Sequence, residues 1–407
     1  MKILIISAAF PPMQAGEADH ALNICRQLGQ RGLEVHVLTT KGYEESVNEP
    51  FSAYPVMSDW SWSDLPRLIR FVKRCSPDVI FLIYIGLIYN YHPMMTFAPT
   101  ICRALCPHVR FVTLFEYPLG WAPSRWSILT RGVRRAVERW ASRRDVDYEF
   151  GSLLRDSDSL VVLSNYHRDK LARRWPEVRT KSVLVPPPPL LRMSPENGGI
   201  SRHRTREKLG LAPNDFLIAY FGYIYPPKGV ETLFKAFQIV SSQRNNVWLI
   251  LIGGVLAREY SERPSYAREM RELPKQLGIE QKVIWIGEYA TDSDEASLFL
   301  RAADTCVFAH DSGVYLNNSS FAAAAAHGLP IVATQGSMLE EPFIDRENVL
   351  LCPPKSPEPM AAAIMAILDD PDLKKRLHQG SLRLASEWFS WEKAIDRIVQ
   401  TFSAHQQ

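Results

Sequence analysis

Short apolar segments alternate with segments of helical periodicity along most of this chain. Residues 2–7 and 34–40 are apolar runs, and residues 21–31 between them place apolar side chains at helical spacing. Continuous apolar runs of this kind are typical of strands buried on both faces of a parallel sheet. Strand, helix and strand in this order form a βαβ unit, so the sequence predicts an α/β fold.

The same alternation starts again in the second half of the chain. Further apolar runs, each expected to be a strand, lie at 78–85, 109–115, 159–164, 182–186, 216–222, 247–254, 282–287, 305–310 and 329–334. Between the two sets, four consecutive prolines at 186–189 remove backbone donors and stiffen the chain. We therefore expect two successive doubly wound domains over residues 1–195 and 196–385, followed by a tail helix over 386–407.

The composition argues against several classes of function. Lys and Arg number 47 against 44 Asp and Glu, and the net charge of +3 gives no signal for nucleic-acid binding. The six cysteines are scattered, so we expect reduced thiols and no metal site. The apolar start is too short for a signal peptide, and the longest apolar run, 79–91, is too short to span a bilayer. We therefore expect a cytoplasmic protein.

Two loops in the second half are candidates for binding an anion. In open α/β sheets, ligands bind at the carboxyl ends of strands, in the loops that enter helices. The first loop runs from Gly222 to Lys228 and Gly229, where backbone N–H groups and a lysine favour a phosphate. The second, 310–320, leads into an alanine-rich helix with Ser319 or Ser320 as its expected N-cap. An ordinary strand-to-helix turn and a well-capped core helix are the alternatives.

Two features of the first half are weaker candidates. An opening loop contains Gly16, Asp19 and His20, a glycine beside two groups that can transfer protons, although such a histidine is more often packed or capping. Residues 125–144 interleave arginines with tryptophans and aliphatic side chains. A basic amphipathic helix of this kind can lie on an anionic membrane or hold an anionic acceptor. It is equally compatible with a solvated surface helix.

The order of these segments resembles the retaining glycosyltransferases of family four, which have the GT-B fold. The similarity runs from PPMQAGEADHALNICRQLGQRGLEVHVLTT through FGYIYPPKGVETLFKAF, LRAADTCVFAH and AAAAAHGLPIVAT to WFSWEKA. It implies two Rossmann-like domains facing across a cleft, with a tail helix that returns to the first. It also implies that the C-terminal domain holds a nucleoside-diphosphate sugar of UDP or GDP type. The N-terminal domain would hold the sugar, lipid-linked or small-molecule acceptor, and no metal or other cofactor would be needed.

The resemblance assigns donor-binding residues by position. Lys228 matches the diphosphate-binding lysine, Gly16 the glycine-rich first loop, and residues 317–320 the backbone that holds the phosphates. Asp311 and Gly313 match an Asp-x-Gly-Val motif found in a subgroup of the family. The expected donor-binding set is Gly16, Gly222, Tyr223, Lys228, Gly313, Asn317, Asn318, Ser319 and Ser320.

Several positions differ from the family pattern. Tyr223 stands in place of an arginine, Asn317 and Asn318 in place of paired arginines, and Tyr315 and Ala323 in place of two glutamates. Asparagine keeps hydrogen-bond donors but removes charge, and charge-assisted contacts are about twice as strong as neutral ones. Three explanations for the missing arginines remain open. The protein relies more on helix N-termini to bind the diphosphate, its donor carries less charge, or it has lost activity.

The catalytic groups are left open by the sequence. Phe115 takes the place of a catalytic-loop histidine, with Glu116 next to it. Glu116 and Asp311 are our catalytic candidates, with Glu17 or the donor phosphate as other proton acceptors. The leading hypothesis is a hexosyltransferase of polysaccharide, glycolipid or natural-product assembly. The alternatives are an inactive binding or partner subunit, and a sugar-nucleotide epimerase on the same fold.

Overall fold

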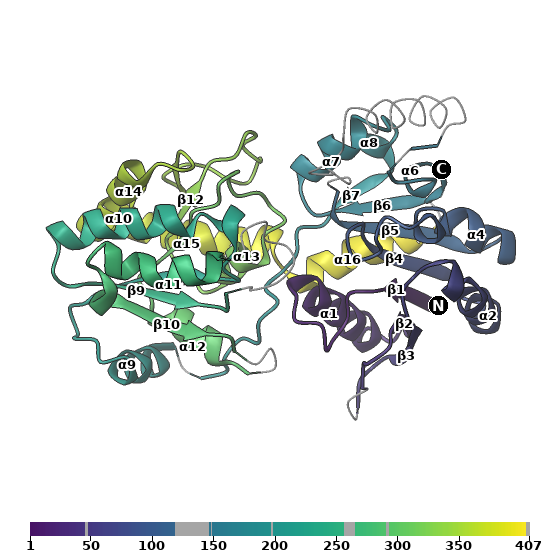
Figure 1. The fold of residues 1–407 in the computed structure, drawn as a ribbon, viewed down its shortest axis with the longest axis horizontal. Helices are drawn as coiled ribbons and strands as arrows, with labels where there is room; N and C mark the ends of the chain where they lie inside the picture. Colours follow the sequence, from purple (N-terminus) through teal and green to yellow (C-terminus); the bar gives the residue numbers. More distant parts are fainter. Residues whose placement is uncertain are drawn as a thin grey trace. The chain divides into compact units, whose positions relative to one another are not determined.

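The computed structural model describes residues 1–44, 48–118, 146–147, 149–196, 198–255, 265–289 and 293–403, and it divides into two compact units (Figure 1). Unit 1 contains Met1–Pro186 and Trp391–Gln407, and unit 2 contains Pro187–Ser390. Unit 2 thus begins inside the proline run, ahead of the boundary expected between residues 195 and 196. The basic segment 125–144, for which we considered membrane contact, lies outside the described residues.

Unit 1 is built on a seven-stranded sheet in the order β3-β2-β1-β4-β5-β6-β7, and neighbouring strands pair in parallel. The strands are β1 Lys2–Ser7, β2 Glu34–Thr40, β3 Ser52–Met57, β4 Val79–Ile85, β5 Arg110–Tyr117, β6 Ser159–Val162 and β7 Ser182–Leu184. Every residue of β4 is buried, as expected for the centre of a doubly wound sheet. Strand β3 was not expected from the sequence. It contains Pro55 and lies at the sheet edge, where a missing N–H donor is tolerated.

Helices connect the strands of unit 1. They are α1 Gly16–Gln30, α2 Leu65–Cys75, α3 Pro93–Thr96, α4 Ala98–Leu105, α6 Leu153–Asp156, α7 Asn165–Ala172 and α8 Val178–Lys181, with the 3-10 turn η1 Trp62–Asp64. Helix α1 begins five residues earlier than the expected start at Ala21, so Asp19 and His20 lie in its first turns and not in a loop. The burial of Ala18 and His20 explains the earlier start, because these side chains continue the apolar face of the helix.

The last helix, α16 Trp391–Phe402, belongs to unit 1. Ile395, Ile398 and Phe402 are buried with residues of β1 and β4, and the Phe402 ring lies 5.5 Å from the ring of Phe81. Arg110 on β5 donates from Nε to the carbonyl oxygen of Thr401 at 2.6 Å. The tail therefore packs on the N-terminal sheet, although α15 Pro371–Trp388 of unit 2 extends past the expected start of the tail helix at residue 386.

Unit 2 is built on a six-stranded parallel sheet in the order β10-β9-β8-β11-β12-β13. The strands are β8 Phe216–Phe221, β9 Val247–Ile252, β10 Val283–Gly287, β11 Thr305–Phe308, β12 Ile331–Thr334 and β13 Leu350–Cys352. The strand order reverses between β8 and β11. In open α/β sheets this topological switch point is where ligand-binding loops diverge.

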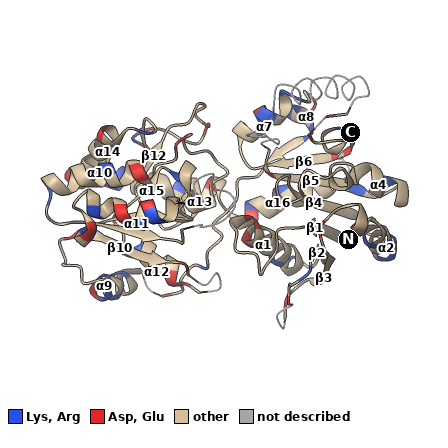
Figure 2. Cartoon of the chain, in the orientation of Figure 1, with Lys and Arg blue, Asp and Glu red and all other residues tan. Residues whose placement is uncertain are grey.

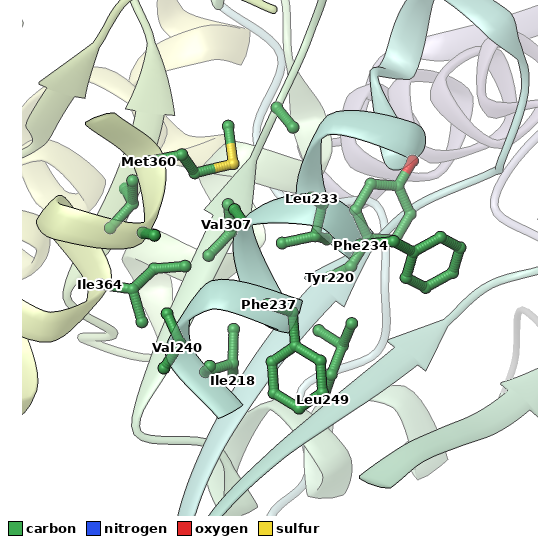
Figure 3. Packing of buried hydrophobic residues seen from close by; sticks show 14 of the residues in the cluster. Ile218, Tyr220, Leu233, Phe234, Phe237, Val240, Leu249, Val307, Met360 and Ile364 are labelled. Carbon is green, nitrogen blue, oxygen red and sulfur yellow. The ribbon is translucent and has the colours of Figure 1, made fainter. Parts of the chain in front are cut away.

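The connections of unit 2 are α9 Gly198–Lys208, η2 Pro226–Lys228, α10 Val230–Gln243, α11 Tyr266–Gln276, η3 Glu280–Lys282, α12 Glu295–Ala302, α13 Ser319–Ala326, α14 Pro357–Asp369 and α15. Figure 3 shows how α10 is held: Leu233, Phe234 and Phe237 pack toward strand residues such as Leu249, while Ile364 of α14 lies on the other side. This packing fixes the start of α10, and with it the loop that carries Lys228.

The helices of each unit carry both basic and acidic residues (Figure 2). This agrees with the small net charge of +3. Any anion-binding property must therefore come from local arrangements.

Candidate functional site

The carboxyl edge of the unit 2 sheet brings the two expected anion loops together. Gly222 follows β8 directly and the segment 309–318 follows β11, so both loops flank the switch point. A Cβ added to Gly222 would lie 2.9 Å from Oγ of Ser320, which shows how closely the start of α13 approaches the end of β8. The φ of Gly222 is +125°, which disfavours any side chain there.

Backbone contacts join the Lys228 loop to the loop after β11. The N–H of Asp311 donates to the carbonyl oxygen of Pro227 at 2.9 Å. Gly229 has φ +66°, and a Cβ on it would lie 2.0 Å from the carbonyl oxygen of Ala309. Lys228 ends the 3-10 turn η2, and Gly229 is the N-cap of α10. The lysine is therefore fixed at a helix start.

Lys228 and a half-buried histidine are electrostatically linked. His310 is half-buried and follows β11 by two residues, and desolvation followed by the charge of Lys228 holds its pKa well below the ordinary value. The imidazole is therefore neutral at physiological pH. Nζ of Lys228 lies 5.3 Å from the centre of the Tyr225 ring. The local cation at this edge is thus the lysine and not His310.

Asn318, and not Ser319 or Ser320, caps α13. Its Oδ1 accepts a hydrogen bond from the N–H of Phe321 at 3.0 Å, and the two serines are the first residues of the helix. The expected cap is therefore wrong by one or two residues, because the amide of Asn318 competes successfully for the same backbone donors. Nδ2 of Asn318 is buried and has no hydrogen-bond partner among the described residues.

The segment between Asp311 and Asn318 is shaped by a glycine and a tyrosine. A Cβ on Gly313 would lie 2.1 Å from the backbone nitrogen of Gly336, so no side chain fits there. Tyr315 is buried, and its hydroxyl accepts from the N–H of Ser337 at 3.1 Å. Asp311 is partly exposed, with Oδ2 3.8 Å from Nζ of Lys355.

A buried glutamate that the sequence did not single out supports this segment. Glu340 is 1% exposed, and its Oε2 accepts a hydrogen bond from the N–H of Leu316. The positions that carry glutamates in many family members hold Tyr315 and the fully buried Ala323. The carboxylate of Glu340 therefore contacts the backbone of this segment, although Glu340 lies 24 residues further along the chain than Leu316. A contact over this sequence distance cannot be predicted from a local sequence pattern.

A cavity of about 620 Å³ lies at the carboxyl ends of β9 and β10. It is lined by Gly254, Val255, Ala267, Arg268, Arg271, Gly287 and Glu288. Its volume falls within the range of small-molecule sites. A Cβ on Gly253 would lie 2.2 Å from the carbonyl oxygen of Gly222, so the cavity adjoins the strand end that leads into the Lys228 loop.

The candidates in unit 1 lie on α1 and β5. Nδ1 of His20 contacts Oε1 of Glu116, and both side chains are buried. Burial, and secondarily the charge of Glu17, raises the pKa of Asp19 to about 6. Gly16 begins α1, and a Cβ on it would meet nothing within 4 Å. This edge therefore holds a histidine–carboxylate pair beside a carboxyl group that titrates near neutral pH.

Comparison with known families separates the chain into two matched parts. Residues 16–188 match the family described as Glycosyltransferase Family 4, and residues 201–382 match the family described as Glycosyl transferases group 1. The chain belongs to the group 1 and family 4 glycosyltransferases. The two matched segments fall within unit 1 and unit 2 respectively, apart from residues 187 and 188.

Solved structures of similar fold confirm the GT-B architecture. The Anabaena protein HepE, in complex with UDP and glucose, is 17% identical with a TM-score of 0.70, over 98% of this chain and 99% of that one. Sucrose-phosphate synthase from Thermosynechococcus elongatus is 18% identical with a TM-score of 0.68, over 99% and 98% of the two chains. At these identities the likeness shows the fold alone.

The D-inositol 3-phosphate glycosyltransferase of Jonesia denitrificans is 29% identical over 227 residues, which are 54% of this chain and 50% of that protein. The chain thus spans about half the length of such curated relatives. Among the described residues, no helix is long and apolar enough to cross a membrane. The described part of the chain also contains no cluster of three or more His, Cys, Asp or Glu residues able to hold a metal ion.

Proposed function

We propose that this chain is a retaining glycosyltransferase that moves a sugar from a nucleoside-diphosphate donor to an acceptor. The observation that carries the proposal is the start of α13, where the buried Nδ2 of Asn318 has no partner among the described residues. A donor group left unpaired beside a helix N-terminus suits a phosphate oxygen. Lys228 lies on the neighbouring loop, at the start of α10.

In this proposal the diphosphate is bound by one cationic side chain and by several backbone N–H groups. Lys228 supplies the cation, and the N-termini of α10 and α13 supply backbone N–H groups. Gly222, Gly229 and Gly313 keep side chains away from the phosphates, and the amides of Asn317 and Asn318 replace the charges of two arginines. The cavity beside Gly254 accommodates the nucleoside. UDP is the first candidate, since HepE binds UDP, UDP and glucose, and UDP-glucose.

The transfer step needs a leaving diphosphate and a proton acceptor. The bond between the anomeric carbon and the diphosphate oxygen breaks, and its electron pair leaves with the nucleoside diphosphate. The acceptor hydroxyl oxygen bonds to the same face of that carbon, and its proton passes to a phosphate oxygen of the donor. Lys228 and the helix dipoles stabilise the charge that develops on the leaving group. Asp311 is our candidate for stabilising the positive charge on the sugar.

We place the acceptor on unit 1, where Asp19, His20 and Glu116 lie. A carboxyl group with a pKa of about 6 and a histidine–carboxylate pair suit binding and orienting a hydroxyl group. Glu116 is the catalytic candidate on this unit. A hydroxylated small molecule, sugar or lipid-linked sugar fits this chemistry, in polysaccharide, glycolipid or natural-product assembly.

A thermal-shift panel with UDP, GDP, ADP and dTDP tests the donor site. A nucleotide at about a hundred times its dissociation constant adds roughly 2.7 kcal/mol, which moves the melting temperature by a few degrees. We expect a shift with UDP that Lys228→Ala abolishes. Lys235→Ala is the matched control, because Lys235 is an exposed lysine on α10. No shift with any nucleotide, or an equal shift in both variants, would overturn the donor site.

A second candidate function is a non-catalytic relative that binds the donor without turning it over. Tyr315 and the buried Ala323 favour it, because neither offers a carboxylate where many family members have one. Turnover separates the two functions. We expect release of UDP from UDP-glucose in the presence of sugar acceptors. Tight binding of UDP without any UDP release across a broad acceptor panel would favour the non-catalytic function.

A further inference from the structure

A second cavity lies at the opposite edge of the unit 2 sheet from the donor loops. Its volume is about 600 Å³, within the range of small-molecule sites. Asp304, immediately before β11, and Pro330, immediately before β12, both line it. The amino ends of these strands face this cavity, whereas the carboxyl end of β11 leads into a loop assigned to the donor.

The lining of this cavity is strongly basic. Its cations are Arg202 on α9, Arg301 on α12, and Lys374 and Lys375 on α15. Asp304 contributes the single carboxylate of the lining. An excess of positive charge in a chain with nearly balanced charge is a local property.

The carboxylate of Asp304 is already engaged. Its Oδ1 accepts from Nη2 of Arg202 at 2.9 Å and from Nζ of Lys374 at 3.1 Å. Its Oδ2 accepts from the N–H of Leu217 at 2.9 Å. Burial acts to raise the pKa of Asp304, but Lys374, the Leu217 N–H and Arg202 outweigh it and hold the pKa below the usual value. Asp304 is therefore ionised, and it neutralises one cation of the lining.

The remaining cations have no carboxylate partner in the described part of the chain. Arg301 donates to the carbonyl oxygens of Glu196 and Ser194, each at 2.7 Å, and these oxygens carry no net charge. Lys375 is exposed and forms no hydrogen bond or ion pair with a described residue. Each is thus available to an anion that enters the cavity.

Apolar side chains complete the lining. Met193 is 41% exposed and Leu382 is 42% exposed, and both border the cavity with Leu329 and Pro330. Helix α15, of 18 residues, begins here at Pro371 and is capped by Asp370, whose Oδ1 accepts from the N–H of Leu373 at 2.9 Å, so the cations of the lining and not the helix start are offered to an anion. An anion with an apolar or ring-shaped body matches this combination better than an inorganic ion does.

The cavity is connected to the donor loop through one short helix. His327, in the lining, is the C-cap of α13, and its Nδ1 contacts the carbonyl oxygen of Ala323 at 2.8 Å. The other end of the eight-residue helix, about 12 Å away, begins at Ser319 beside the cap Asn318. A ligand that shifts the C-terminal end of α13 moves its N-terminal end as well, because a helix this short is rigid.

We propose that this cavity is an effector site for a small organic phosphate, and that its occupancy changes the affinity of the donor site for nucleotide. The binding part stands on the cavity alone, and the effector part rests on the proposed function.

Titration of the full chain with phenyl phosphate, monitored by calorimetry, tests the binding. Saturating UDP is present throughout, so that the donor site is occupied and phenyl phosphate can bind only elsewhere. We expect Lys375→Glu to weaken phenyl phosphate binding by about threefold or more, and Lys235→Glu to leave it unchanged. Leu382→Ala should bring phenyl phosphate closer to inorganic phosphate in affinity. Absence of binding in the unaltered chain, or full retention in Lys375→Glu, overturns the site.

Titration with UDP, at zero and at saturating phenyl phosphate, tests the effector role. We expect the dissociation constant of UDP to change by about twofold or more in the unaltered chain and to stay constant in Lys375→Glu. An unchanged constant in both proteins overturns the effector role while leaving the binding site in place. A chain that binds phenyl phosphate through Lys375 but no nucleotide would contradict the proposed function, and the effector role with it.

Discussion

Nδ1 of His20 on α1 contacts Oε1 of Glu116 on β5, and the two side chains are only 4% and 7% exposed. The residues are 96 positions apart in the sequence, and they meet because β1, β4 and β5 are neighbours in one parallel sheet. This buried contact ties the first helix of unit 1 to the carboxyl end of β5.

Removing the imidazole tests the stabilising value of this contact. His20→Ala leaves the buried carboxyl group of Glu116 without its partner, so we expect the free energy of unfolding to fall by about 1–3 kcal/mol. His36→Ala is the matched control, since His36 contacts the exposed Glu34 at 2.9 Å and such pairs contribute at most about 1 kcal/mol. Chemical denaturation measures both. Equal losses would show that burial adds nothing to the His20 contact.

Glu116→Gln tests the proposed catalytic role separately, because it keeps the shape of the side chain. We expect the turnover number to fall by about tenfold or more, with the dissociation constant of UDP unchanged. Steady-state kinetics combined with a UDP titration gives both quantities. Full turnover in this variant would exclude a role for the Glu116 carboxylate in orienting the acceptor hydroxyl.

Two glycines with nearly the same backbone conformation allow the cost of backbone strain to be distinguished from the cost of a steric clash when each is replaced by alanine. Gly229 has φ +66° and Gly210 has φ +71°, but a Cβ would meet the carbonyl oxygen of Ala309 at 2.0 Å in the first case and nothing within 4 Å in the second. We expect Gly210→Ala to cost about 1–2 kcal/mol of stability, the price of the left-handed conformation alone. Gly229→Ala should cost about 3 kcal/mol or more and weaken UDP binding. Similar unfolding midpoints for the two variants would contradict the contact at Gly229.

The raised pKa of Asp19 predicts a pH-dependent stability. Its folded pKa of about 6 exceeds the ordinary value of 3.8, so the folded state binds the proton more tightly than the unfolded chain. The contribution of Asp19 is therefore fully present below about pH 4 and is lost as pH rises through 6. We expect Asp19→Asn to match the unaltered chain near pH 4 and to exceed it by about 1–3 kcal/mol at pH 8. Melting curves from pH 4 to 8 that stay parallel would contradict this assignment.

Glu340 should stabilise the donor loop. Glu340→Ala leaves the N–H of Leu316 buried without an acceptor, which costs about 1–3 kcal/mol, and the loosened loop should bind UDP more weakly. Its neighbour Glu341 is exposed, so Glu341→Ala should change stability by no more than about 0.5 kcal/mol. Denaturation and UDP titration of the pair make the comparison. Identical UDP affinities would show that Glu340 does not act on the donor site.

The sequence predicted most of the fold because buried parallel strands give continuous apolar runs. It missed β3 and β13, both edge strands, of which β13 has only three residues and β3 is interrupted by a proline. Edge strands need less burial, so their apolar pattern is weak. The start of α1 was also misplaced, because Gly16 and Glu17 carry no apolar signal.

The sequence by itself determined the α/β class, the two-part organisation and the strand-end loops that carry Lys228, Gly222 and Asn318, since each follows from local periodicity and helix-start chemistry. Only the tertiary structure decided that His20 meets Glu116 and that Glu340 supports Leu316. It also decided that Arg202, Arg301 and Lys375 line one cavity. These pairings join residues far apart in the chain, and their proximity is set by strand order and helix packing, which no local sequence pattern encodes.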